Sequence, residues 1–335
     1  IGYAPSVMAN DQLTWETTDQ WNVGVDFGFL KNRINGTVEF YLQNTKDLLL
    51  KRQLPVVSGF SSVMSNVGST RNKGIEITLN TRNIMNRNFT WSTDLTFSAN
   101  KEEIVELYNG KTDDVGNLWF IGQPIDVYYN YKKIGIWQNT ENDLAEMAKF
   151  NEKGANFKPG SIRLEDVDGD YKITEEDKQI LGSVRPKFVA SMVNNFEFKG
   201  FDLSVFLYAS VGGLLRNNIE FMEKPGRGNT VKVDYWTSTN PTNAFPRPSV
   251  DVEKLDYIST LGYDKADFLR IRNITFGYTL PEMWSKKVLM DKIRIYLSAN
   301  NPAIFTNFTG IDPEGANGRT APSYSTWMFG INLSM

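Results

Sequence analysis

Apolar and polar residues alternate along several stretches of the chain. From Trp21 to Phe29 every second residue is apolar, and the residues between them are Asn, Gly and Asp. Because successive side chains of a β-strand point to opposite faces, this run predicts a strand with one apolar and one polar face. Eight further runs alternate in the same way, so nine strands are predicted over 21–29, 34–43, 75–80, 89–99, 188–198, 201–209, 268–280, 293–299 and 327–335.

The two faces of the predicted strands differ in composition. The apolar face includes Val23, Val25, Leu95, Phe97, Leu203, Val205, Ile295 and Ile331. The polar face includes Asp26, Glu39, Glu76, Asp94, Asp202, Arg270, Arg272 and Arg294. Within one strand the apolar positions change from odd numbers, such as Leu269, to even numbers, such as Ile274. One extra residue in a strand has this effect, and a β-bulge is predicted near Arg272 and Asn273.

The links between the predicted strands are short and long in turn. The short links are 30–33, 83–87, 199–200 and 281–290, and the long links are 51–70, 102–186, 215–264 and 301–323. Transmembrane barrels of the bacterial outer membrane have this asymmetry, with short periplasmic turns and long extracellular loops. The strands are long enough to cross a bilayer at a tilt, and Trp21, Trp91, Tyr278 and Trp327 near their ends suit the membrane interface. A soluble antiparallel sandwich, with the apolar face buried, is the alternative interpretation.

The odd number of strands bears on how such a barrel closes. Single-chain bacterial barrels have even strand numbers, and an open sheet edge is not tolerated in lipid. We therefore expect residues 1–335 to be the C-terminal part of a larger all-β, antiparallel transmembrane barrel, with earlier strands outside this sequence. The run 125–137 could be a tenth strand, but parity places it within the 102–186 loop. A helix is predicted over 139–154, capped near Thr140.

The chain contains no histidine and no cysteine. Their absence excludes a Ser-His-Asp triad, a Cys-His pair, a zinc site built from these residues, and a disulfide. No convincing pair of catalytic carboxylates is recognisable either, and we expect the protein not to be an enzyme. With 36 basic and 39 acidic residues and a net charge of −3, the chain gives no reason to expect nucleic-acid binding.

The segment 166–177 has the sequence DVDGDYKITEED and matches the ligand spacing of an EF-hand calcium loop. The spacing assigns the oxygen ligands to Asp166, Asp168, Asp170, the Lys172 carbonyl, Thr174 and Asp177. Two positions depart from the motif, because Tyr171 stands where glycine makes the turn and Asp177 replaces a longer glutamate. We predict a structural Ca²⁺ site. The alternatives are a plain acidic turn, or an N-cap formed by Thr174 and Asp177 ahead of a short helix through Leu181.

Aromatic residues are frequent in the long links. Trp119, Tyr235 and Trp236 are candidates for substrate binding, because aromatic rings can stack on sugars and peptides. The alternative is that these rings pack the loops against one another, and the sequence favours that interpretation for any single ring.

Several motifs resemble those of SusC/RagA-like TonB-dependent outer-membrane transporters. They occur in order along almost the whole chain and include NKGIEITL at 72–79, PIDVYYNYKKIGIWQ at 124–138, PGSIRLEDVDGDYKIT at 159–174 and DFLRIRNITFGYTLP at 267–281. The strand–turn–strand run at 15–41 and the NPAIFTNFTGIDPE run at 301–314 belong to the same set. The chain departs from the pattern at its last strand, which ends NLSM where such barrels usually carry a terminal aromatic residue.

The resemblance implies a barrel of about twenty-two strands with a plugged lumen, in the outer membrane of a Gram-negative bacterium. It also implies import of oligosaccharides or peptides with energy from the TonB complex, beneath a SusD-like surface lipoprotein that acts as a lid. The plug is expected to be absent from this chain, and the loops 102–186 and 215–264 are expected to form the mouth that faces the lid. Two other classes stay open, a soluble β-rich glycan-binding module and an adhesion barrel that transports nothing.

Overall fold

The structure is a computed structural model that describes residues 7–108, 110–217, 233–248, 255–314 and 323–335. The loops predicted over 215–264 and 301–323 are therefore described only in part. Among the described residues, no helix has both the length and the apolar character needed to cross a bilayer.

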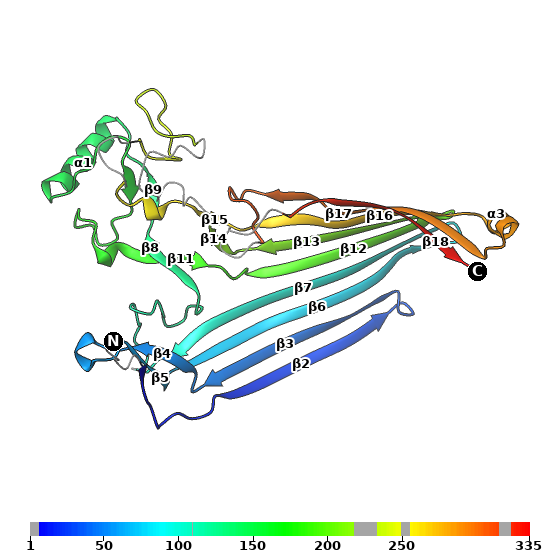
Figure 1. Ribbon diagram of the computed structural model, residues 1–335, viewed down its shortest axis with the longest axis horizontal. Coiled ribbons are helices and arrows are strands. Elements are labelled where there is room, and N and C mark those ends of the chain that lie inside the picture. Colours follow the sequence, from blue (N-terminus) through cyan, green and yellow to red (C-terminus); the bar gives the residue numbers. More distant parts are fainter. Residues whose placement is uncertain (1–6, 109, 218–232, 249–254, 315–322) are drawn as a thin grey trace, which may run out of the picture.

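Nine antiparallel strands form one long sheet in the order β18-β17-β16-β13-β12-β7-β6-β3-β2 (Figure 1). This confirms the nine strands predicted from the alternation. Their bounds are β2 (Thr17–Phe29), β3 (Ile34–Lys46), β6 (Ser69–Met85), β7 (Phe89–Glu106), β12 (Phe188–Phe198), β13 (Phe201–Val211), β16 (Phe268–Thr279), β17 (Lys292–Thr306) and β18 (Thr326–Ser334).

The strand register places the apolar positions of all nine strands on one face of the sheet. Leu203 pairs with Phe276, Phe276 with Leu297, and Leu297 with Phe329. Many of these side chains are exposed, including Val23, Val25, Phe276, Ile295 and Ile331. The opposite face is polar and carries paired charges, since Arg294 Nε donates to Asp202 Oδ1 at 2.9 Å. The sheet thus has one apolar surface that the described residues leave uncovered.

A β-bulge interrupts the ladder between β13 and β16. Phe206 pairs with Asn273 and Leu207 pairs with Ile271, so Arg272 is left over on β16. This confirms the bulge predicted from the change of parity. Its effect is that Leu269 stays on the apolar face while Arg270 stays on the polar face, where the Arg270 guanidinium lies against Asp312.

The short links lie at one end of the sheet and the long links at the other (Figure 1). Three short links are tight turns, over 30–33, 86–88 and 199–200, and the fourth contains α3 (Glu282–Ser285) and the 3-10 turn η4 (Lys286–Val288). The neighbouring strands β6 and β7 extend towards the long links. Strand β7 ends at Glu106, so the predicted start of the loop 102–186 at residue 102 was wrong. The reason is that backbone pairing continues where both faces are polar and the alternation has ended, as in the Lys73–Lys101 pair.

The long links contain short elements of their own. The link between β3 and β6 holds β4 (Leu49–Gln53), η1 (Val56–Ser58) and β5 (Ser62–Asn66), and β5 also pairs with β1 (Val7–Met8). The link between β7 and β12 holds β8 (Val127–Tyr131), β9 (Lys133–Ile136), α1 (Glu141–Glu152), β10 (Ile162–Leu164), η2 (Glu175–Asp177) and β11 (Lys178–Ser183). The link between β13 and β16 holds β14 (Leu214–Arg216), η3 (Ile258–Thr260) and β15 (Tyr263–Lys265).

Two predictions for the link between β7 and β12 are confirmed. The run 125–137 forms β8 and β9, which pair with β11 and β10 and not with the nine-stranded sheet. The helix predicted over 139–154 is α1, and the Thr140 side chain caps it by accepting a hydrogen bond from the Asp143 N–H at 3.3 Å.

Candidate functional site

Residues of the two longest links pack into one apolar core beyond the long-link end of the sheet (Figure 1). We call the described residues of 127–183 and 233–265 the loop module. Its core consists of Ile136, Ile162 and Leu164 from the first link, and of Trp236, Ile258 and Leu261 from the second. Because each link supplies half of these buried side chains, neither link can form this core alone.

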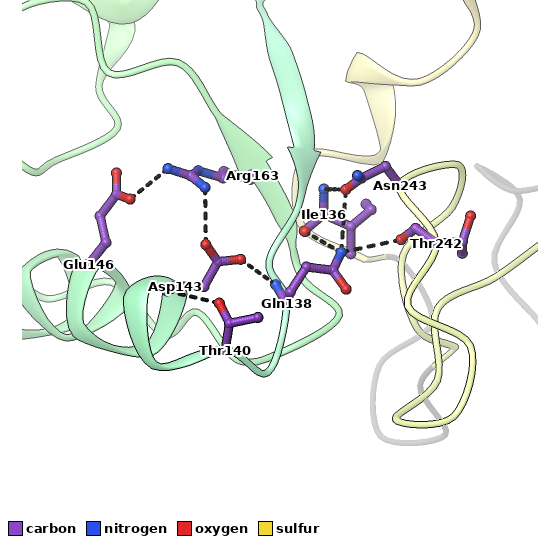
Figure 2. Close-up of polar contacts among 8 residues, drawn as sticks. All are labelled: Ile136, Gln138, Thr140, Asp143, Glu146, Arg163, Thr242 and Asn243. Atoms are coloured by element: carbon purple, nitrogen blue, oxygen red, sulfur yellow. Dashed lines mark hydrogen bonds and ion pairs between the residues drawn. The ribbon is translucent and has the colours of Figure 1, made fainter.

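Helix α1 covers one side of the loop module. Its buried residues Met147 and Phe150 pack against Trp137, and the Trp137 and Phe150 rings meet edge to face at 5.9 Å. Arg163 on β10 holds the same face of the helix, because its guanidinium lies 3.2 Å from Asp143 Oδ1 and 2.6 Å from Glu146 Oε2 (Figure 2). The guanidinium also lies 4.4 Å from the centre of the Trp137 ring. The helix is therefore fixed by both apolar and charged contacts.

Gln138 joins the two links through its side-chain amide (Figure 2). Its Nε2 donates to the Ile136 carbonyl at 2.7 Å in its own link and lies 3.3 Å from Asn243 Oδ1 in the other. Asn243 Oδ1 also accepts the Ile136 N–H at 3.0 Å. On its other side, Gln138 Oε1 accepts a hydrogen bond from Trp236 Nε1 at 2.8 Å. Both ends of this amide are satisfied, and they fix Trp236 relative to the first link.

The acidic loop 166–177 is folded by its own carboxylates. Asp166 accepts the N–H groups of Gly169 and Tyr171, each at 2.9 Å. Asp177 is fully buried and accepts the N–H groups of Val167 at 2.8 Å and Thr174 at 2.7 Å. These bonds explain how the loop turns tightly without glycine at its sixth position, where Tyr171 adopts a φ of 62°.

The structure brings together three of the six predicted calcium ligands. Carboxylate oxygens of Asp166, Asp168 and Asp177 lie within 4.8 Å of one another. Asp170 is outside this group and accepts the Lys172 N–H at 2.7 Å. The Thr174 hydroxyl accepts the Glu176 N–H at 3.2 Å.

The alternative that Thr174 and Asp177 cap a short helix is confirmed for the cap and wrong for the helix. Thr174 and Asp177 form the reciprocal cap expected of them, but the cap opens only the 3-10 turn η2. The helix considered through Leu181 is wrong, since these residues form strand β11 and pair with β8. The reason is a partner in the long-range fold, which overrides the local helix signal.

The electrostatics of the acidic loop favour a cation. The Asp170 N–H lowers the pKa of the Asp168 carboxyl, but desolvation and the carboxylates of Asp170 and Asp177 outweigh it, so this pKa is raised. A divalent cation among the three clustered carboxylates would remove that repulsion. Calcium binding by this loop stays a prediction.

Calcium is expected to stabilise the loop module of the purified full-length protein. The stabilisation should reach about 2.7 kcal/mol when free Ca²⁺ is roughly 100 times its dissociation constant. This stabilisation is measured as the difference in protease resistance of the loop with calcium and with a chelator. Asp168→Asn should abolish the effect, whereas the matched variant Asp170→Asn should reduce it less, because Asp170 is outside the cluster. Equal protease resistance with and without calcium would contradict the prediction.

The three aromatic candidates for substrate binding lie in different surroundings. Trp236 is only 8% exposed, because it belongs to the shared core of the loop module. Tyr235 is 46% exposed. Trp119 is half-buried beside Leu50 and Val67, against residues of the link between β3 and β6. Substrate binding by these rings stays a prediction, and the burial of Trp236 favours the packing alternative for that residue.

A cavity of about 560 Å³, which the sequence did not predict, is lined by three of the long links. Lys133 contributes a cationic donor, and its Nζ donates to the Asn243 and Ala244 carbonyls at 2.8 and 2.7 Å. Burial lowers the pKa of Lys133, and the nearby Asp264 carboxylate opposes this shift. Asn217 is buried, and its Oδ1 has no partner among the described residues. No local motif could have indicated this cavity, because its lining comes from segments far apart in the sequence.

On the polar face of the sheet, an ion cluster holds the link between β17 and β18. The buried Arg270 lies 2.7 Å from Asp312 Oδ1 and 2.7 Å from Glu314 Oε2. Arg272 forms a further ion pair with Glu314, and its guanidinium lies 4.8 Å from the centre of the Tyr208 ring. This cluster closes one side of a second cavity, which Tyr208, Phe268 and Glu314 line.

Comparison with known proteins identifies relatives of this architecture. A family described as TonB dependent receptor-like, beta-barrel matches residues 2–301. TonB-dependent receptor P3 of Formosa agariphila is 32% identical over 97% of this chain and 35% of its own length. TonB-dependent receptor SusC of Bacteroides thetaiotaomicron is 30% identical over 97% of this chain and 32% of its own length. The chain thus spans about a third of the length of the curated relatives it matches.

Solved structures agree with the fold. The RagAB peptide importer in its open-open state is 26% identical, with a TM-score of 0.76 over 98% of this chain and 36% of that one. A further structure of the RagAB peptide transporter is 24% identical and has a TM-score of 0.78, over 99% of this chain and 37% of that one. These matches confirm the resemblance found in the motifs.

Proposed function

Since this chain belongs to the TonB-dependent receptor-like β-barrel family, we propose that it forms part of the wall and the outer mouth of an outer-membrane importer. The importer would take up oligosaccharides or peptides, with energy delivered through TonB. The likeness to the RagAB peptide importer supports peptides as the first class to test.

The observation that carries the proposal is the sheet with one uncovered apolar face and one polar face. Water would disfavour such a surface, which runs over all nine strands, whereas the hydrocarbon core of a membrane suits it. Within the described part of the chain, the edge strands β2 and β18 each have a neighbour on only one side. Because an open edge is not tolerated in lipid, we propose that further strands of a larger barrel pair with both edges.

The loop module supports an outer mouth with a fixed shape. Its two links share one core, and Gln138 and Asn243 connect them directly. We propose that a SusD-like lipoprotein docks on this side and that substrate passes it on the way to the lumen. The cavity lined by Lys133 and Asn217 offers a cationic donor and polar oxygen atoms, which suits a peptide or a sugar.

Uptake in cells that carry the full-length protein tests this function. We expect labelled peptides or oligosaccharides to enter only when both the protein and TonB are present, and the protein to leave the outer-membrane fraction only in detergent. Retained uptake without TonB would contradict the energy source. A protein that is water-soluble without detergent would instead support the glycan-binding alternative, and an outer-membrane protein without uptake would support the adhesion barrel.

A further inference from the structure

One of the four links at the short end of the sheet differs from the other three. The turns 30–33, 86–88 and 199–200 are brief, whereas residues 280–291 form a helical link with α3 and η4. Its sequence is LPEMWSKKVLMD. Four of its apolar side chains are between 53% and 88% exposed, namely Met283, Trp284, Val288 and Leu289.

The helical link is held in place by the backbone, so its apolar side chains are presented by a defined structure. The Leu280 N–H donates to the Ile293 carbonyl at 2.9 Å, and the Asp291 N–H donates to the Ser334 carbonyl of β18 at 2.8 Å. Ser285 is fully buried, and its carbonyl accepts the Met290 N–H at 3.1 Å. With Ser285 packed inside, the larger apolar residues of the link face outwards.

The helical link joins strand ends that carry exposed apolar and aromatic side chains. At the strand ends nearest the link, the Phe201 ring lies 4.4 Å from Tyr278 and 5.8 Å from Phe276. Ile293, which follows the link, pairs with the exposed Leu333 on β18. Aromatic rings at this level are typical of the membrane interface, and exposed apolar side chains occur both at these strand ends and in the link.

The charge at the short end complements an anionic surface. The four links carry six basic side chains, Lys31, Arg33, Arg87, Lys199, Lys286 and Lys287, and two carboxylates, Glu282 and Asp291. This end is therefore positive, although the whole chain has a net charge of −3. Lysines beside exposed apolar residues place their stems along the hydrocarbon boundary and their ammonium groups at lipid phosphates.

We propose that the helical link 280–291 is an interfacial anchor that lies in the headgroup layer of the phospholipid leaflet at the short-link end of the barrel. Met283, Trp284, Val288 and Leu289 enter the acyl boundary, and Lys287 meets the phosphates, whereas Lys286 is ion-paired with Glu282 inside the link. A short amphipathic segment of this kind binds a membrane surface without crossing it. The inference rests on the proposed function, because it requires that the sheet lies in a membrane.

Contact with lipid can be measured at single cysteines in the full-length protein, and this chain has no cysteine of its own. Variants Leu289→Cys, Val205→Cys and Asp170→Cys, each labelled with bimane, are placed in vesicles of phosphatidylethanolamine and phosphatidylglycerol. Bromine on the acyl chains quenches a fluorophore that touches lipid. Val205 is a reference on the apolar face, and the exposed Asp170 is a reference in the loop module.

We expect bromolipid to quench the labels at 289 and 205 to a similar extent and to leave the label at 170 unchanged. Quenching at 205 without quenching at 289 would overturn the anchor and leave the membrane barrel intact. No quenching at 205 would overturn the membrane barrel itself and the anchor with it.

Discussion

Replacing Trp236 with alanine is expected to open the loop module and leave the nine-stranded sheet intact. Trp236 is almost fully buried, and removing a buried tryptophan side chain costs about 3–5 kcal/mol of stability. Its Nε1–H bond to Gln138 Oε1, which connects the two links, is lost as well. Hydrogen exchange of the Ile136 and Leu261 amides in the full-length protein should become about a hundredfold to several thousandfold faster.

The adjacent residue provides the matched control for this experiment. Tyr235 is also aromatic but is 46% exposed, so Tyr235→Ala should change exchange in the module little. A defect in substrate uptake in Tyr235→Ala, with normal exchange, would support the stacking role predicted for that ring. Equal exchange in the Trp236→Ala and unmodified proteins would contradict the shared core.

Replacing Arg270 with alanine is expected to release the link between β17 and β18 from the polar face of the sheet. Removing one partner of a buried ion pair costs about 3–5 kcal/mol, because the other charge is left buried and uncompensated. That charge is the Asp312 carboxylate, which is 6% exposed. The Glu314 amide, which donates to Asp312 Oδ1 at 3.0 Å, should then exchange much faster.

Arg272 is the matched control for Arg270. It belongs to the same cluster but is more exposed, and Glu314 is its one ion-pair partner among the described residues. Exposed ion pairs contribute about 0–1 kcal/mol, so Arg272→Ala should leave the Glu314 amide largely protected. If the Glu314 amide exchanges equally fast in Arg270→Ala and Arg272→Ala, the burial of Arg270 is not the reason for the faster exchange.

The pH dependence of this link follows from Asp312. Burial alone would raise the pKa of the Asp312 carboxyl, but hydrogen bonds from the Ser323 hydroxyl, the Glu314 N–H and Arg270 outweigh burial and lower it. A carboxyl with a lowered pKa in the folded state stabilises that state at neutral pH. Its contribution is lost as the pH falls below about 4, and protection of the Glu314 amide should fall over the same range.

The alternation predicted the sheet well because the strands have two chemically different faces. Apolar and polar sides impose a period of two on each strand, and the one change of period, near Arg272, marks the bulge. The pattern failed where that contrast ends. At Lys101, Glu102 and Glu103 both faces of β7 are polar, yet the strand continues to Glu106, because backbone pairing with β6 needs no apolar residue.

The candidate site was less predictable, since its contacts join distant residues. The spacing of Asp166, Asp168 and Asp177 placed three carboxylates together, because a short loop fixes them locally. In contrast, Trp236 meets Gln138 across 98 positions, and no local pattern could show that its ring is covered. The cavity at Lys133 and Asn217 depends in the same way on how the links fold over one another.

The core shared by the two longest links also limits how such a protein can diversify. A link taken from a relative would bring only half of that core, and its partner would still present Trp236 or Ile136 to a surface shaped for other side chains. Loops that pack independently can be exchanged one at a time, but these two must be inherited or grafted as a pair. New binding preferences at this mouth are therefore expected to arise by recombination of both links together, or by substitution at exposed positions such as Tyr235 that leave the core unchanged.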